Sequence, residues 1–150
     1  MSHTYYKHLF HLVWSTKERY PLLVPEYKSN TYAYIASVFK SKECHALNIG
    51  GMSDHIHILA TIPPKICIAD LIHDAKLGTT KWLRNTFANA SDFAWQEGYG
   101  SFMVAASNKD SVAHYILTQE IHHKKYDFRT EFLNLLKEND VDFEEKYLWK

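Results

Sequence analysis

The chain has 150 residues, of which 46% are apolar and 15% aromatic, enough for one domain with a core and inconsistent with a disordered segment. Its net charge is zero and gives no support for nucleic-acid binding, although residues 1–137 hold 15 Lys or Arg against 12 Asp or Glu and the remaining tail is acidic. Two isolated cysteines exclude a secreted disulfide framework, no run is long enough for a membrane span, and the start does not resemble a signal peptide. We therefore expect a cytoplasmic protein without membrane contact.

The first half of the chain predicts a strand, a helix and a hairpin. Residues 5–14 alternate in polarity and are rich in aromatic and branched side chains, which is typical of a strand. Residues 26–42 carry apolar side chains near helical spacing. Residues 43–52 and 55–62 are two short strand-like runs joined through glycines, and two prolines end the second run.

The second half predicts a helix, a fourth strand and added helices. Residues 66–87 place apolar side chains along one side of a predicted helix, and Gly78 weakens the middle of that helix. Residues 99–107 are predicted to form a strand. A capping box of Ser107 and Asp110 opens a helix over residues 112–125. A last helix covers residues 129–139. The order β-α-β-β-α-β predicts an α+β, ferredoxin-like fold: an antiparallel sheet with two helices on one face, and C-terminal helices added to one domain over residues 1–150.

Two histidines share one face of the second hairpin strand. Side chains alternate along a strand, so His55 and His57 lie together on the face that the two main helices leave uncovered. Their Cα atoms are expected roughly 7 Å apart, a spacing at which two imidazoles can bind one metal ion. Taken alone, such a pair is more often two surface histidines. The neighbouring Asp54 is read first as a turn residue, and second as a partner that orients one imidazole.

A second cluster lies on the predicted helix over residues 112–125. Tyr115 and Gln119 are four residues apart and share a helix face. On this pattern alone, the simpler interpretation is that Tyr115 packs and Gln119 is solvated. The chemical interpretation is that Gln119 joins His55 and His57 in a metal site, beside which the helix places Tyr115 as a nucleophile. Oxygen ligation favours Mg²⁺ or Mn²⁺, and the two imidazoles shift the preference toward Mn²⁺.

Together these patterns resemble the single-tyrosine HUH transposases of small bacterial insertion sequences, the insertion-sequence 200/605 group. The HUH motif, two histidines around a bulky apolar residue, reads His55-Ile56-His57. The resemblance extends over nearly the whole chain, through the segments HLVWSTKERYPLL, SDHIHILATIPP, AKLGTTKWL, WQEGYG and YILTQEIHH.

The resemblance implies a metal-dependent enzyme that cuts and rejoins single-stranded DNA at the ends of a mobile element. Tyr115 would attack a phosphodiester and stay attached to the 5′ phosphate, while His55, His57 and Gln119 would hold Mg²⁺ or Mn²⁺. The family also recognises imperfect DNA hairpins and forms homodimers, in which the helix bearing the tyrosine can complete the partner subunit's site.

Single strands are held by stacking on aromatic rings and by local positive charge. Seven basic residues are candidates for phosphate contacts, although each one alone is more typical of a solvated side chain: Lys17, Arg19, Lys76, Lys81, Arg84, Lys124 and Lys125. Two alternatives stay open, a domesticated repeat-associated tyrosine transposase with the same chemistry and a non-catalytic single-stranded nucleic-acid-binding module. His11, His122 and His123 receive no role.

Overall fold

The computed structural model describes residues 3–149 and contains, within them, one four-stranded antiparallel sheet in the order β2-β3-β1-β4. The strands are β1 (Leu9–Ser15), β2 (His45–Gly51), β3 (His55–Thr61) and β4 (Gly100–Met103). The helices are α1 (Pro25–Ser41), α2 (Ile68–Thr86), α3 (Lys109–Leu117), α4 (Gln119–His122) and α5 (Phe128–Glu138). This order confirms the predicted ferredoxin-like α+β fold. None of the described helices has the length and apolar character that crossing a membrane requires.

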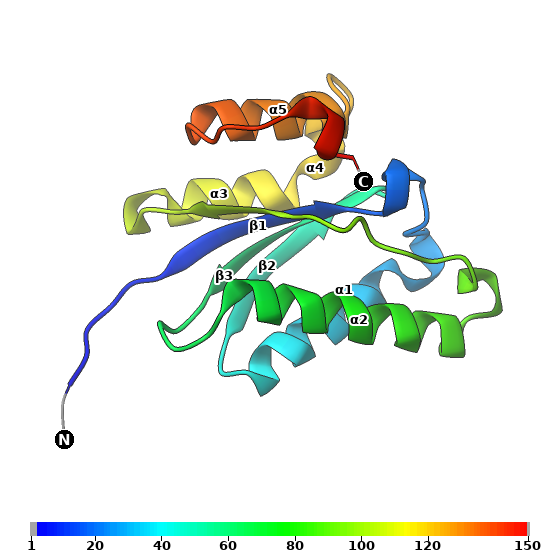
Figure 1. Cartoon of the computed structure of the whole chain (residues 1–150), viewed down its shortest axis with the longest axis horizontal. Helices are drawn as coiled ribbons and strands as arrows, with labels where there is room; N and C mark the ends of the chain where they lie inside the picture. The colour runs from blue at the N-terminus through cyan, green and yellow to red at the C-terminus, as the bar shows by residue number, and fades with distance from the viewer. Residues whose placement is uncertain (1–2, 150) are drawn as a thin grey trace.

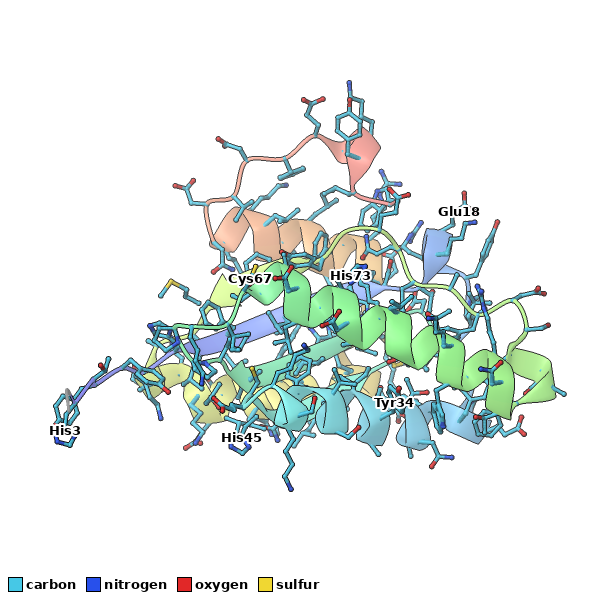
Figure 2. The ribbon with its side chains drawn as sticks, turned by 60° about the horizontal axis from the view of Figure 1, so that its bottom comes forward. His3, Glu18, Tyr34, His45, Cys67 and His73 are labelled. Atoms are coloured by element: carbon cyan, nitrogen blue, oxygen red, sulfur yellow. The ribbon has the colours of Figure 1, made fainter. Side chains whose placement is uncertain are left out.

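Helices α1 and α2 lie side by side over one face of the sheet (Figures 1 and 2). The isoleucines of β3 point to this face and are buried with apolar side chains of β1, α1 and α2 in the main core. At Gly78, a Cβ would lie 3.1 Å from the hydroxyl oxygen of Tyr34 on α1, closer than most real contacts. The glycine that weakens the middle of α2 therefore also lets the two helices approach each other, and α2 continues through it.

The opposite face is covered by α3, α4 and α5 (Figure 1), so the prediction that His55 and His57 point to an uncovered face was wrong. Two small apolar clusters hold these helices on the sheet. One joins Ile116 of α3 to Leu9 and Leu59, and the other joins α5 to β1 and β4 through Val13, Phe102, Phe128, Phe132 and Leu136. The sequence shows that α3 and α5 each have an apolar side, but it does not show which surface that side covers.

The long helix predicted over residues 112–125 is divided into α3 and α4. The break is at Thr118, with φ −109° and ψ 29°, and the Thr118 hydroxyl donates to the His114 carbonyl oxygen at 2.8 Å. Such hydrogen bonds back to the preceding turn often bend helices. The predicted capping box is also absent: α3 begins at Lys109 after a 3-10 turn, with no side-chain cap on its first turn. The first strand is shorter than predicted and begins at Leu9.

Helix α3 lies very close to β2 at Gly50. A Cβ at this position would lie 2.1 Å from the carbonyl oxygen of Ile116, so only glycine permits the contact. Gly50 is also the residue of β2 that pairs with His57. The glycine therefore sets how closely the helix carrying Tyr115 approaches the histidine strand.

Candidate metal and tyrosine site

Strands β1 and β3 bring three imidazoles to the face beneath α3, α4 and α5. His55 and His57 are fully buried there. His11 of β1 lies on the same face, because its neighbour Val13 pairs with His57 and side chains on one face of a strand recur every two residues. The His11 Nε2 atom is 2.8 Å from Nδ1 of His57. His11, which the sequence left without a role, is thus a direct neighbour of the HUH motif.

Four potential ligand atoms converge between the sheet and the helices. Nε2 of His57 lies 2.8 Å from Oε1 of Glu131, a residue of α5. Nε2 of His55 lies 3.0 Å from Oε1 of Gln119 and 3.4 Å from Oε1 of Glu131. The ligand atoms of His55, His57 and Glu131 all lie within 4.8 Å of one another, so one ion can contact all three.

The hydrogen bond on the far side of His55 orients its inner nitrogen toward the centre of the site. Oδ1 of Asp54 lies 2.7 Å from Nδ1 of His55 and, as a carboxylate oxygen, it accepts the Nδ1 proton. In the neutral imidazole, Nε2 then carries a lone pair that faces the oxygens of Gln119 and Glu131, which are also acceptors. These three atoms can ligate one cation, and a second partner on the other ring nitrogen is typical of histidine metal ligands. Asp54 is therefore a partner that orients the His55 imidazole, which was the second interpretation of this residue from the sequence, after that of a turn residue.

Burial keeps two of the imidazoles neutral. It lowers the pKa of His57 to about 4, despite the opposing effect of the Glu131 carboxylate. It also lowers the pKa of His11 to about 3. Neutral imidazole is the form that binds a metal, so His57 is in the required state at neutral pH. Nε2 of His11 can accept a hydrogen bond from the Nδ1–H group of His57. In that tautomer, Nε2 of His57 carries no proton and can bind a metal.

Glu131 is the site residue that the sequence interpretation missed. Burial raises the pKa of its carboxyl group, but hydrogen bonds from His123 and His57 outweigh burial and hold that pKa well below its usual range. Nε2 of His123 lies 3.3 Å from Oε1 of Glu131 and 3.0 Å from Oε1 of Gln119. The pKa of His123 is raised, since its contact with Glu131 outweighs the opposing effect of burial. The site thus contains an ionised carboxylate among imidazoles.

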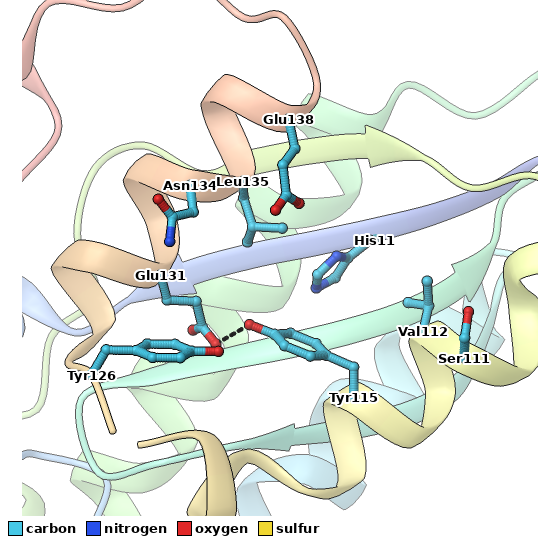
Figure 3. A pocket seen from close by; sticks show the side chains of 9 residues that line it. All are labelled: His11, Ser111, Val112, Tyr115, Tyr126, Glu131, Asn134, Leu135 and Glu138. Atoms are coloured by element: carbon cyan, nitrogen blue, oxygen red, sulfur yellow. Dashed lines mark hydrogen bonds between the residues drawn. The ribbon is translucent and has the colours of Figure 1, made fainter. Parts of the chain in front are cut away.

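Tyr115 reaches this site from α3. Its hydroxyl donates a hydrogen bond to Oε2 of Glu131 (Figure 3), and its ring stacks on His122 with centroids 4.6 Å apart. Burial, and then the hydrogen bond to Glu131, raise the pKa of the phenol well above its ordinary value. Tyr115 is therefore a neutral phenol whose proton already faces a carboxylate. Despite the break at Thr118, Gln119 still follows Tyr115 by one turn, and its Nε2 lies 3.3 Å from the Tyr115 carbonyl oxygen.

Two of the seven basic candidates for DNA contact donate hydrogen bonds to backbone carbonyl oxygens of the chain itself. The Lys76 ammonium donates to the carbonyl oxygens of Gly98 and Gln96 at 2.6 and 2.9 Å. The Arg84 guanidinium donates twice to the carbonyl oxygen of Phe93, at 2.9 and 2.7 Å. Both residues therefore brace the segment before β4. Among the other five, Lys17, Lys81, Lys124 and Lys125 are exposed and Arg19 is half-buried, and their contact with DNA stays a prediction.

Comparison with known proteins gives one family and two similar folds. The family described as IS200-like transposases matches residues 4–119. A candidate transposase from Deinococcus radiodurans R1 is 21% identical, with a TM-score of 0.63, over 77% of this chain and 93% of that one. A REP-associated tyrosine transposase bound to a REP hairpin is 15% identical, with a TM-score of 0.55, over 77% of this chain and 70% of that one. No curated protein matches the chain. The family match ends before α5, so Glu131 lies outside it.

Proposed function

We propose that this chain, which belongs to the IS200-like transposase family, cuts and rejoins single-stranded DNA at mobile-element ends through a covalent 5′-phosphotyrosine at Tyr115. One observation carries the proposal: the Tyr115 hydroxyl is hydrogen-bonded to one oxygen of Glu131, while the other oxygen of that carboxylate faces His57. A nucleophile, a proton acceptor and a set of metal ligands therefore meet within a few ångströms.

We assign His55, His57, Gln119 and Glu131 as the residues that hold a divalent metal, either Mg²⁺ or Mn²⁺. Their donor set fits, because two imidazole nitrogens, an amide oxygen and an ionised carboxylate oxygen converge on one point. When bound, such an ion polarises the oxygens of the phosphate under attack. Glu131 extends the ligand set expected from the sequence.

The residues of the chain itself account for the movement of protons. A phenol with a raised pKa is a poor nucleophile, so Tyr115 must lose its proton as it attacks. The lowered pKa of Glu131 makes it a weak base, but its Oε2 is the oxygen in hydrogen-bond contact, placed to carry this proton transiently. As the bond between the tyrosine oxygen and phosphorus forms, the bond from phosphorus to the 3′ oxygen breaks, and that oxygen takes the proton that Glu131 accepted, becoming a 3′ hydroxyl. Rejoining is the reverse: a 3′ hydroxyl attacks the phosphotyrosine and Tyr115 recovers its proton. No nucleotide cofactor is needed, because the phosphodiester energy is kept in the intermediate.

The arrangement supports cleavage within one chain. The observation that supports this is that Tyr115 contacts Glu131 of its own chain. A homodimer that exchanges the tyrosine helix stays a prediction. The similar fold that was solved with a REP hairpin supports single-stranded DNA hairpins as the substrate class here. It equally supports the domesticated, repeat-associated role, in which the same chemistry acts on dispersed genomic hairpins.

The test is a covalent-adduct assay with single-stranded oligonucleotides that tile the DNA flanking the gene. Because the 5′ phosphate stays on the protein, a 3′ label on the DNA should move with the protein band in Mg²⁺ or Mn²⁺. Tyr115→Phe should form no adduct while still binding DNA, whereas Tyr5→Phe, which changes an exposed tyrosine, should behave like the wild type. An adduct formed by Tyr115→Phe would refute the assignment. Intact DNA affinity without any metal binding would favour the non-catalytic binding module.

A further inference from the structure

A cavity of about 250 Å³ opens beside Tyr115, between α3, α5 and β1 (Figure 3). Its floor is formed by the site already described, through His11, Tyr115 and Glu131. The ring of Tyr126 closes one end, and the side chains of α5 form the wall above. An occupant of this cavity therefore lies close to the tyrosine that we propose as the nucleophile.

The wall on α5 is polar, and two of its side chains, Asn134 and Glu138, are exposed and open to a ligand. Glu131, Asn134 and Glu138 follow one another at three- and four-residue spacing, so they share the face of α5 that looks into the cavity. Among the described residues, neither the Asn134 amide nor the Glu138 carboxylate makes a hydrogen bond or ion pair with another side chain or with the backbone. Figure 3 shows the Glu138 side chain directed from α5 toward His11, and Asn134 near Glu131 on the same helix. The cavity thus offers one carboxylate and one amide to a ligand.

The carboxylates of the lining disfavour a phosphate group in the body of the cavity, away from the Tyr115 hydroxyl. The lining includes two carboxylates, Glu131 and Glu138, and no lysine or arginine. Carboxylates repel phosphate but accept hydrogen bonds from amino groups. The volume is below the roughly 300–1,000 Å³ typical of pockets for drug-sized ligands, which suits a single flat ring system. Enzymes that act on nucleic acids commonly hold an unstacked base in this way, against aromatic side chains and polar groups.

We propose that this cavity holds the base of one of the two nucleotides that flank the scissile phosphate, and that it prefers a base with an exocyclic amino group over thymine. The Glu138 carboxylate accepts a hydrogen bond from the amino group, and the Asn134 amide provides both a donor and an acceptor to the same edge. Tyr126 provides an aromatic surface beside the base. The inference rests on the proposed function, because it takes the Tyr115 hydroxyl as the reacting group.

The test compares two probes that differ mainly at this edge: oligo(dC) and oligo(dT) of about twelve nucleotides, a length within the usual range of single-strand binding sites. Affinity is measured by fluorescence anisotropy at neutral pH with EDTA, so that no strand is cut. The wild type should bind oligo(dC) about five- to tenfold more tightly than oligo(dT), the discrimination expected from one well-made hydrogen-bond pair to a base edge. Glu138→Gln and Asn134→Ala should reduce this ratio toward one.

The control is Asn85→Ala, which changes an exposed asparagine on α2 and should keep the wild-type ratio. Equal affinity of the wild type for the two probes would overturn the proposal, as would a ratio that survives Glu138→Gln. These outcomes do not depend on strand cutting, so a failure here is distinct from a failure of the adduct assay. Adduct formation at Tyr115 together with equal binding of the two probes would leave the proposed function intact and remove the base pocket.

Discussion

The two faces of the sheet differ in what burial does, and a single strand contributes to both. On one face of β3, Ile56 and Ile58 are fully buried against α1 and α2 and form the core. On the other face, His55 and His57 are buried to the same degree, between two small apolar clusters. Burial of the isoleucines stabilises the fold. Burial of His57 instead removes its imidazole from water, lowers its pKa and keeps it neutral. The degree of burial therefore does not distinguish the apolar face from the histidine face. The partners of each buried side chain do.

The largest effect is expected on the apolar face. Ile58→Ala removes a fully buried side chain from the central strand pair and leaves a cavity, so the free energy of unfolding should fall by ~2–5 kcal/mol. Urea unfolding followed by circular dichroism measures the change. Ile121→Ala, which truncates an exposed isoleucine on α4, should change stability by no more than about 0.5 kcal/mol. Equal losses in the two variants would contradict the division between the faces.

The histidine face should respond to metal instead. At a Mn²⁺ concentration a hundredfold above its dissociation constant, the wild type should gain about 2.7 kcal/mol of stability, because the ion binds only the folded chain. Glu131→Gln should lose most of this gain, since it removes the charged ligand and keeps the side-chain shape. Thermal melts with Mn²⁺ and with EDTA measure the difference. Glu97→Gln, an exposed glutamate outside the site, should gain as much as the wild type, and an undiminished gain in Glu131→Gln would remove that residue from the ligand set.

A smaller effect is expected one contact farther from the metal. His11→Ala removes the side chain that contacts Nδ1 of His57 and orients this ligand. Mn²⁺ affinity should fall ~10–100-fold, the usual effect of losing a partner of a metal-bound histidine. Isothermal titration calorimetry measures it, with His45→Ala, an exposed histidine of β2, as the matched control. An unchanged affinity in His11→Ala would mean that His11 only fills space.

The smallest effect concerns the helix that supplies Glu131. The Asp127 carboxylate accepts a hydrogen bond from the Thr130 backbone N–H at 3.0 Å and caps the start of α5. Asp127→Ala should therefore cost ~1 kcal/mol of stability. Urea unfolding of this variant and of Asp142→Ala, an exposed aspartate in the tail, tests the cap. Equal midpoints for the two variants would show that the cap contributes nothing.

The same comparison shows how far the sequence alone could lead. The alternation of β3 and the helical stripe of α2 placed the core face correctly, because local periodicity encodes which side chains lie together. Tyr115, Gln119 and the histidine pair were predicted to share one site, and the structure brings all four close together, while their roles stay predictions. Glu131 was missed because its contact with His57 spans 74 residues and depends on where α5 packs. One signal was present: Glu131 lies within the apolar stripe of α5, between Phe128 and Phe132.

The broken helix and the covered face have related causes. A helical pattern that continues across Thr118 does not show that its hydroxyl bonds back to the preceding turn and separates α3 from α4. The close approach of α3 to β2 depends on Gly50, which in the sequence reads only as part of a hairpin. Both features are set by contacts distant in the chain, which local patterns do not specify.

The most direct test of the central claim is to locate the DNA on the protein. The adduct formed with Mn²⁺ and single-stranded DNA is trimmed with nuclease and digested, and the modified peptide is sequenced by mass spectrometry. The account predicts a 5′-linked nucleotide on Tyr115, in the peptide that spans α3. A nucleotide on any other residue, or DNA cut without a covalent link to the chain, would contradict it.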